Sequence, residues 1–183
     1  MSIHLITGCM FSGKTSALIN TAKMNKLLNK KVLIINFNGD VRYCDKNKIA
    51  THDNVQFDCI PCAQDLLFLI IGTKEYTSAD VICINEGQFF DNLVNFCLET
   101  CKLGKEVHVC GLDGDYLKRP FGEVLNLIPH CDTVCKLNAL CMGCKNGNIA
   151  SFTKKIIKSE NLVEIGSTEM YMPVCRKCYD KII

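Results

Sequence analysis

The chain has 183 residues, of which 48% are hydrophobic, so it can form one domain with a substantial core and a small appended unit. Its formal net charge is +2 and no basic block stands out, which argues against stable nucleic-acid binding. No apolar run approaches the roughly 20 residues of a membrane-spanning helix, so we expect no membrane partner.

A glycine-rich loop follows the first predicted strand, residues 3–7, and precedes a helix-like stretch, residues 16–24. Residues 8–15 read G-x-x-x-x-G-K-T, which predicts a phosphate-binding loop with backbone N–H groups and a helix N-terminus facing one anion. Lys14 is expected to reach the β- and γ-phosphates of ATP, and the Thr15 hydroxyl to ligate Mg²⁺. The predicted nucleotide-binding residues are Gly8, Cys9, Met10, Phe11, Ser12, Gly13, Lys14 and Thr15.

Short apolar runs then alternate with segments of helical length. Further strands are predicted at 31–35, 55–60, 81–86, 106–111 and 134–137, and helices at 63–76 and 91–103. This alternation predicts an α/β fold with a P-loop NTPase-like parallel sheet flanked by helices. We expect this kinase-like domain to span residues 1–138.

Residues 36–54 are polar and are predicted to form a loop. Asp40 and Arg42 lie there, beyond the carboxyl end of a parallel strand, where ligands bind in such sheets. Arg42 could contact phosphate, and Asp40 a sugar hydroxyl or the metal. A solvated loop with a surface ion pair is an equally good interpretation.

Cys59 and Cys62 have the C-x-x-C spacing of a redox pair. Nothing around them resembles a thioredoxin-like context, so we favour two ordinary thiols.

The run 81–86 ends in Asn85 and Glu86, at a place where a central strand delivers polar side chains to the phosphate site. P-loop enzymes usually carry an Asp there to hold the Mg²⁺ shell, and here the residue is Asn85. Glu86 could act as a general base on an acceptor hydroxyl.

The loop 112–122 has two aromatic, two basic and two acidic residues. This composition suits a lid over a flat polar ligand, and an ordinary connection between elements is the alternative.

Residues 139–183 differ from the rest because they contain two C-x-x-C knuckles, which predict a small zinc-binding domain. Four thiolates satisfy a tetrahedral structural Zn²⁺ and leave no open position for catalysis. The predicted ligands are Cys141, Cys144, Cys175 and Cys178. The segment between the knuckles, 146–173, has little core pattern and could fold over a ligand.

Fourteen cysteines would suit a secreted disulfide-rich protein. The chain starts directly with a predicted strand, with no secretory signal ahead of it, and carries a nucleotide-binding motif. We therefore expect a reducing, cytoplasmic location with free thiols and metal ligands.

Together these motifs resemble the cellular and poxviral type of thymidine kinase over nearly the whole chain. The resemblance rests on the glycine loop, the two knuckles and four further motifs: Asp-Val-Arg-Tyr at 40–43, Thr-His-Asp at 51–53, Glu-Gly-Gln-Phe-Phe at 86–90 and Arg-Pro-Phe-Gly at 119–122. It implies a P-loop domain followed by a zinc-pinned "lasso" that closes over thymidine, usually in a homotetramer.

The resemblance also implies residue roles. Catalysis would involve Lys14, Arg42 at the phosphates, and Glu86 as the base for the thymidine 5′-hydroxyl. Asp40 and Asn85 would lie near the sugar and the metal. Thymidine would contact Met10, Asp40, Phe89, Leu112, Tyr116, Phe121, Thr153, Leu162, Val163, Glu164, Ile165, Gly166 and Tyr171.

The chain departs from the family pattern at Asn85, at Tyr116, where Phe is more common, and in a segment about two residues longer after Cys144. A switch GTPase is disfavoured because the chain has no N-K-x-D motif. A zinc-ribbon nucleic-acid-binding module is disfavoured by the near-neutral charge, and a sister kinase that prefers deoxyuridine or another nucleoside remains an alternative.

Overall fold

The computed structural model describes all of the chain except residues 40–46, 51–55, 66, 157–169 and 182–183. Six parallel strands form the central sheet, which confirms the predicted α/β class. Their order is β5 (Ile60–Cys62), β2 (Val32–Phe37), β6 (Val81–Asn85), β7 (Glu106–Leu112), β1 (Ser2–Gly8) and β8 (Thr133–Leu137).

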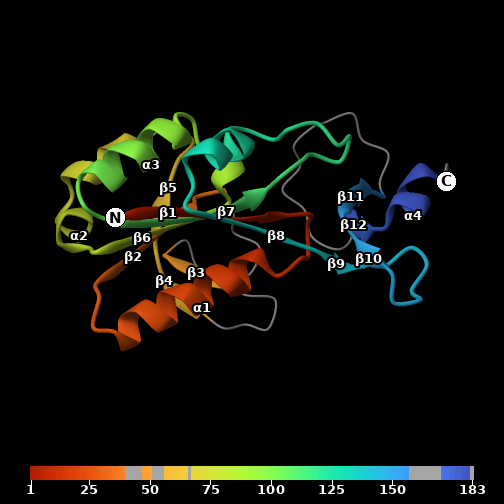
Figure 1. Ribbon diagram of the computed structural model, residues 1–183, viewed down its shortest axis with the longest axis horizontal. Helices are drawn as coiled ribbons and strands as arrows, with labels where there is room; N and C mark the ends of the chain where they lie inside the picture. The colour runs from red at the N-terminus through yellow and green to blue at the C-terminus, as the bar shows by residue number, and fades with distance from the viewer. Residues whose placement is uncertain (40–46, 51–55, 66, 157–169, 182–183) are drawn as a thin grey trace.

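Helices cover both faces of this sheet, as Figure 1 shows. Helix α1 (Lys14–Leu27) packs on one face, and its Leu18 and Ile19 join a core with Cys83 and Cys110. The other face is covered by the 3₁₀ segments η1 (Leu67–Gly72) and η3 (Val124–His130) and by the helices α2 (Lys74–Ser78) and α3 (Leu93–Lys102). Parallel strands buried on both faces are expected to read as continuous apolar runs, which is how they appear in the sequence.

Three predicted elements differ in the structure. The run 55–60 is not one strand, because β4 (Gln56–Asp58) pairs antiparallel with β3 (Lys48–Ala50), whereas β5 joins the parallel sheet. The prediction of a loop throughout 36–54 is therefore wrong at β3, where Ile49 is buried in the α1-side core. The predicted helix 63–76 is instead η1 followed by α2, because the Thr73 hydroxyl accepts a hydrogen bond from the Tyr76 amide and starts a new helix.

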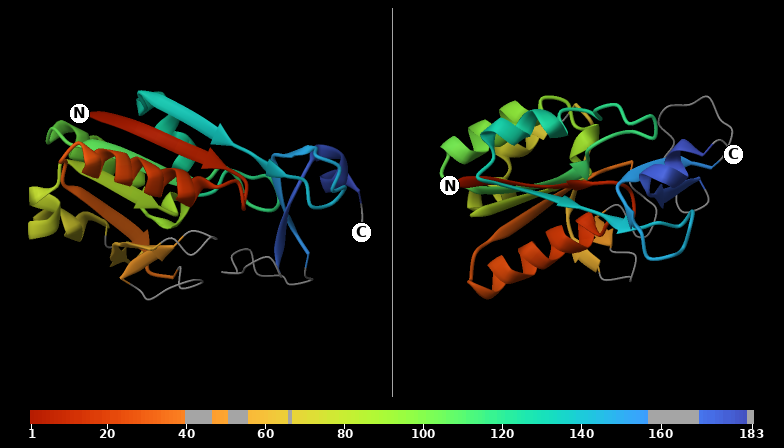
Figure 2. Two further views of the ribbon diagram at one scale, coloured as in Figure 1. Left: turned by 90° about the horizontal axis from the view of Figure 1, so that it is seen from below. Right: turned by 45° about the vertical axis from the view of Figure 1, so that its right-hand side comes forward.

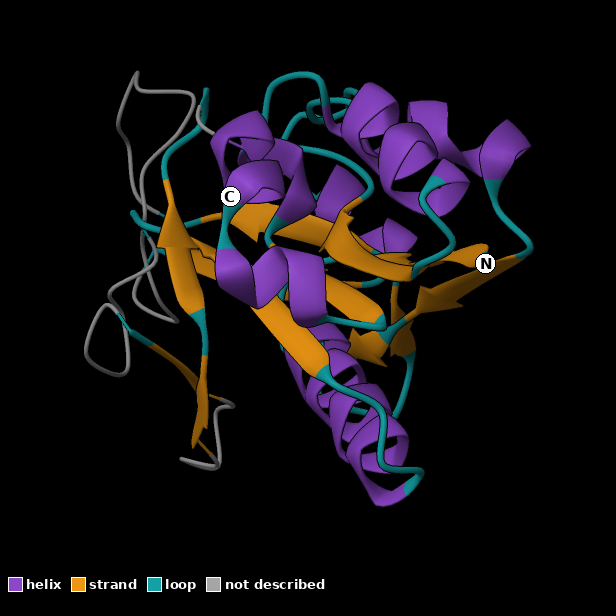
Figure 3. Cartoon of the chain, turned by 90° about the vertical axis from the view of Figure 1, so that its left-hand side faces the viewer, coloured by secondary structure: helices purple, strands orange, loops and turns teal. Residues whose placement is uncertain are grey.

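The C-terminal segments lie beyond the carboxyl ends of the sheet strands (Figures 1 and 2). Strand β9 (Ala139–Leu140) pairs with β10 (Ile149–Ala150), and β11 (Phe152–Lys155) pairs with β12 (Tyr171–Val174). Helix α4 (Arg176–Asp180) follows. The interval 146–173 thus contains more regular structure than the sequence predicted. Figure 3 shows these strands standing apart from the central sheet, and a separate small core supports them.

Candidate functional site

The predicted phosphate loop connects β1 to α1, as expected. Gly8 has φ +142° and Gly13 φ +84°, in the range that other residues rarely adopt. A Cβ at position 8 would lie 2.1 Å from the backbone oxygen of Leu137, so β8 leaves no room for a side chain there. The backbone of this loop therefore has the conformation that the two glycines predicted.

Lys14, the first residue of α1, is folded into this loop and is only 9% exposed. Its Nζ donates a hydrogen bond of 2.7 Å to the backbone oxygen of Cys9, and the Ser12 hydroxyl donates one of 2.8 Å to the same oxygen. Burial lowers the pKa of Lys14, while the nearby Glu86 carboxylate raises it. The loop thus holds one buried amine beside a carboxylate from another strand.

Asn85 is fully buried at the carboxyl end of β6. Its Oδ1 accepts hydrogen bonds from the Thr15 hydroxyl at 3.2 Å and from the Cys110 thiol at 3.0 Å. Its Nδ2 donates to Oδ1 of Asn36, at the matching register of β2, over 2.8 Å. The amide therefore connects the start of α1 with β2 and β7. Asn85 and Thr15, the two residues predicted to lie at the Mg²⁺ site, are thus in direct contact.

Glu86 follows directly, with φ +56° and ψ +44°. A left-handed conformation is unusual for Glu and is often found at functional sites. Gln88 orients this carboxylate, since its Nε2 donates to Oε2 of Glu86 over 2.6 Å. The other end of the Gln88 amide accepts a hydrogen bond of 2.9 Å from the backbone N–H of Leu112.

Gln88 was missed by the sequence analysis. It is 4% exposed and lies against two glycines from distant parts of the chain. A Cβ on Gly111 would lie 2.9 Å from its Oε1, and a Cβ on Gly122 would lie 2.2 Å from its backbone oxygen. Only the fold reveals this, because the glycines follow Gln88 by more than 20 residues.

An aromatic group lies next to these polar residues. The ring of Phe89 stacks on Phe37 with centroids 4.6 Å apart, and Phe121 meets Phe89 edge-on at 5.4 Å. All three rings are partly exposed. The structure thus brings together Phe89 and Phe121, which the sequence assigned to the substrate, and adds Phe37 from the end of β2.

The loop 112–122 is held by its own charges and by the C-terminal unit. Asp115 accepts hydrogen bonds from the backbone N–H of Arg119 and from its guanidinium. The backbone oxygen of Tyr116 accepts one of 2.6 Å from the Tyr179 hydroxyl. Lys155 lies 5.2 Å from the centre of the Tyr116 ring. The loop predicted as a lid is therefore connected to β11 and α4.

The C-terminal unit also contacts the phosphate loop. The Met10 backbone N–H donates a hydrogen bond of 3.0 Å to the Thr153 hydroxyl, and the Cys9 thiol donates one of 3.4 Å to the backbone oxygen of Ala150. Thr153 is buried on β11, and Tyr171 is buried on β12 opposite Lys155. Met10 and Thr153, both predicted to contact substrate, are thus direct neighbours.

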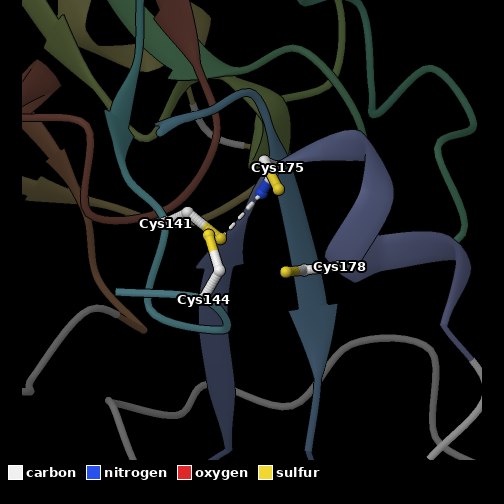
Figure 4. A group of neighbouring side chains, drawn as sticks. All are labelled: Cys141, Cys144, Cys175 and Cys178. Atoms are coloured by element: carbon white, nitrogen blue, oxygen red, sulfur yellow. Dashed lines mark hydrogen bonds between the residues drawn. The ribbon is translucent and has the colours of Figure 1, made fainter. Parts of the chain in front are cut away.

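The four knuckle cysteines converge in space, with all their sulfur atoms within 4.8 Å of one another (Figure 4). The Cys175 backbone N–H donates to the Cys141 sulfur over 3.1 Å, and the Asn148 side chain donates to the Cys144 sulfur over 3.5 Å. N–H groups directed at sulfur stabilise thiolates and are expected around a metal-bound cysteine. This all-sulfur donor set fits a structural Zn²⁺.

Several predicted site residues lie outside the described part of the chain. They are Asp40, Arg42, Leu162, Val163, Glu164, Ile165 and Gly166. Cys59 and Cys62 are described, and both are buried and do not form a disulfide. Burial raises the pKa of Cys62 to about 11, which does not suit a redox nucleophile.

Comparison with known proteins bears on the whole arrangement. A family model described as thymidine kinase matches residues 1–179. Thymidine kinase of Myxoma virus (strain Uriarra) is 40% identical, over 97% of this chain and 95% of the viral protein. Thymidine kinase 1 of Dictyostelium discoideum is 38% identical over 97% of this chain and 77% of its own length.

A plant relative, thymidine kinase a of Arabidopsis thaliana, is 41% identical over 97% of this chain and 74% of its own length. The similarity therefore extends across viral, amoebal and plant sequences and covers both the P-loop sheet and the cysteine knuckles. The chain belongs to the thymidine kinase family.

Proposed function

We propose that this protein transfers the γ-phosphoryl group of ATP to the 5′-hydroxyl of thymidine, giving dTMP for nucleotide salvage. Membership of the thymidine kinase family supports the reaction. The observation that carries the mechanism is that Lys14 is folded into the phosphate loop while Gln88 orients the Glu86 carboxylate directly after β6, at the carboxyl edge of the same sheet.

The phosphate loop binds and orients the nucleotide. Backbone N–H groups between Gly8 and Thr15 and the N-terminus of α1 face the phosphates, because the loop lies between β1 and α1. Lys14 exchanges its bond to the Cys9 backbone oxygen for a phosphate oxygen. A bound Mg²⁺ would supply positive charge against the charge that develops on the transferred phosphoryl group. Thr15 would hold it, with Asn85 accepting a hydrogen bond from its shell.

Glu86 accepts the proton of the attacking 5′-hydroxyl. Gln88 fixes the orientation of this carboxylate by a 2.6 Å hydrogen bond to its Oε2. Because Gln88 is itself bound to the Leu112 backbone, the orientation of Glu86 depends on the neighbouring strand β7.

The thymine base lies against the aromatic group formed by Phe89, Phe121 and Phe37, with Met10, Leu112 and Tyr116 completing its surroundings. This position for the base is supported by the packing of the three rings against one another at the end of the sheet. Thr153 and Tyr171, together with Leu162, Val163, Glu164, Ile165 and Gly166, contact thymidine from the lasso. Asp40 binds the sugar hydroxyl and Arg42 the phosphates.

Residues 139–183 form a separate lasso domain that Zn²⁺ holds closed through the four knuckle cysteines, and residues 1–138 form the kinase domain. The small core around Cys141, Ala150 and Val174 supports this division.

The protein acts as a homotetramer in the cytoplasm, without stable nucleic-acid binding. No described cysteine is part of a disulfide, which agrees with a reducing compartment. Within the described residues no helix is long and apolar enough to cross a membrane.

The proposal is tested with purified protein, Mg·ATP and a panel of deoxynucleosides, scored for the 5′-monophosphate by chromatography. Thymidine should give the highest kcat/KM. A clear preference for deoxyuridine would favour the sister-enzyme alternative, and no turnover of any nucleoside would exclude the proposed reaction.

A further inference from the structure

A second group of metal-ligating side chains lies at the opposite end of the sheet from the phosphate loop. His4 on β1 and His108 on β7 are register partners on neighbouring parallel strands, so their side chains project from the same face. Glu106 lies two residues before His108 and shares that face. One ligand atom from each of the three lies within 4.8 Å of the other two.

The two imidazole rings stack with centroids 4.5 Å apart and planes 16° from parallel. His108 is buried, at 8% exposure, and His4 is partly exposed. The Nε2 atom of His108 lies 2.6 Å from Oε1 of Glu106. Three ligand groups are therefore gathered on two rigid central strands rather than on a loop.

Neighbouring groups orient these ligands. The two nitrogens of His4 lie 2.8 Å from the hydroxyls of Thr133 and Ser2, respectively. Lys30 donates to Oε2 of Glu106 over 2.7 Å and leaves Oε1 directed at His108. To bind a metal, one His4 nitrogen exchanges its hydroxyl partner for the ion, and so do the paired His108 Nε2 and Glu106 Oε1 atoms. The remaining His4 hydroxyl and Lys30 then hold the ligands from behind, as hydrogen-bonded partners of metal ligands typically do.

The chemistry of the group favours a divalent transition ion over Mg²⁺ or Ca²⁺, since two imidazoles and one carboxylate are borderline-soft ligands. Ligand atoms that share a tetrahedral Zn²⁺ are roughly 3.3 Å apart. Binding therefore requires the two rings to turn out of their stack until one nitrogen of each faces the ion.

We infer that His4, Glu106 and His108 form a second metal site, which binds Zn²⁺ or a similar divalent transition ion and joins the amino ends of β1 and β7. From His4 to Gly8 the strand spans about 13 Å at roughly 3.3 Å a residue, so this ion takes no part in phosphoryl transfer. Its effect is on the folded state, which it stabilises by binding. The inference does not depend on the proposed function.

The test uses full-length, tag-free protein with its cysteine knuckles already loaded with zinc. Isothermal titration with Zn²⁺ in a non-coordinating buffer should show one further equivalent per chain. His4→Gln and His108→Gln should each lower the affinity of this equivalent at least tenfold. His130→Gln is the matched control, because His130 is exposed outside the group, and it should bind like the unaltered protein.

A second measurement needs no variant and covers the case in which His108→Gln does not fold. Nitrogen-15 imidazole spectra of the unaltered protein, recorded with and without Zn²⁺, should show shifts at His4 and His108 and none at His130. Heating in the presence of Zn²⁺ should raise Tm for the unaltered protein and for His130→Gln, but not for His4→Gln. Equal titrations for all proteins, with unchanged spectra of His4 and His108, would overturn the inference.

Discussion

Asn85 and Asn36 share a buried hydrogen bond, with Nδ2 of Asn85 donating to Oδ1 of Asn36 over 2.8 Å. The two residues are register partners at the carboxyl ends of β6 and β2. An Asp at position 85, the residue expected in P-loop enzymes, has no N–H to donate. The Asn36 side chain therefore offers the acceptor that an amide at position 85 needs. A substitution at one of the two positions changes the hydrogen bonding of the other.

Asn85→Asp should lower the Mg²⁺ concentration needed for half-maximal rate, because a carboxylate beside Thr15 attracts the divalent ion that an amide does not. The Asn36 side chain can turn its NH₂ group toward the new carboxylate and retain a hydrogen bond. Titration of Mg²⁺ against initial rate in both proteins measures the effect. Thymidine KM should change little.

Asn36→Asp is the matched control for that experiment, because it places the same charge one strand away and keeps an acceptor for Asn85. Its Mg²⁺ midpoint should shift less than that of Asn85→Asp. Equal midpoints in all three proteins would show that position 85 does not sense the metal.

Gln88→Glu should make the reaction more sensitive to acid. The new carboxylate keeps an acceptor for the Leu112 N–H but lies 2.6 Å from the position of the Glu86 oxygen. Two carboxylates so close retain a shared proton to higher pH, so the unprotonated base forms only at higher pH. The acid limb of the kcat–pH profile should move upward, with the rate recovering in alkaline solution.

Gln88→Met provides the control, since it removes the amide without adding charge. It should lower kcat by about tenfold, the equivalent of one lost orienting hydrogen bond, without moving the acid limb. An identical profile for Gln88→Glu and the unaltered protein would contradict the assigned contact with Glu86.

Thr153→Val should weaken the connection between the lasso and the phosphate loop. Valine has nearly the same shape but leaves the Met10 N–H without its hydroxyl partner. We expect KM for thymidine to rise about tenfold. Thr153→Ser retains the hydroxyl and should stay within about threefold of the unaltered protein. Steady-state kinetics of both variants decides between loss of the hydrogen bond and loss of shape.

The knuckle zinc should be required for an ordered lasso. Cys141→Ser should reduce the zinc retained after dialysis and raise KM for thymidine, because the ends of the lasso are no longer held together. Cys135→Ser changes an exposed thiol outside the cluster and should affect neither quantity. Elemental analysis and kinetics on the two variants provide the comparison. Zinc-free, fully active unaltered protein would refute this role.

Much of the sheet could be predicted because β2 and β6 are buried on both faces and have nearly continuous apolar sequences, and because apolar residues recur along β1 and β7. The interruption at Cys59 between β4 and β5 could not be predicted, because β4 pairs with β3 and β5 pairs with β2, and a hydrophobic pattern does not show such a change of partner. Strands β10 and β11 were missed because they are short and depend on the knuckles that fix their ends.

The same distinction applies to the site. A phosphate loop and two C-x-x-C knuckles are local patterns, so Lys14 and the four cysteines were found by reading the sequence. Phe37 carries no such signal, and Gln88 lies within the motif at 86–90 without an assigned role, since each acquires its role from a partner on another strand or loop. The left-handed backbone of Glu86 is likewise visible only in the structure.

The proposed role of Glu86 is tested most directly by the turnover of thymidine in Glu86→Gln. This change keeps the shape of the side chain and removes the proton acceptor, so kcat should fall by about 10²–10⁴-fold while the Kd for thymidine stays nearly constant. The measurement is single-turnover formation of dTMP from Mg·ATP in both proteins, with thymidine binding followed in parallel. Near-normal turnover in Glu86→Gln would contradict the account.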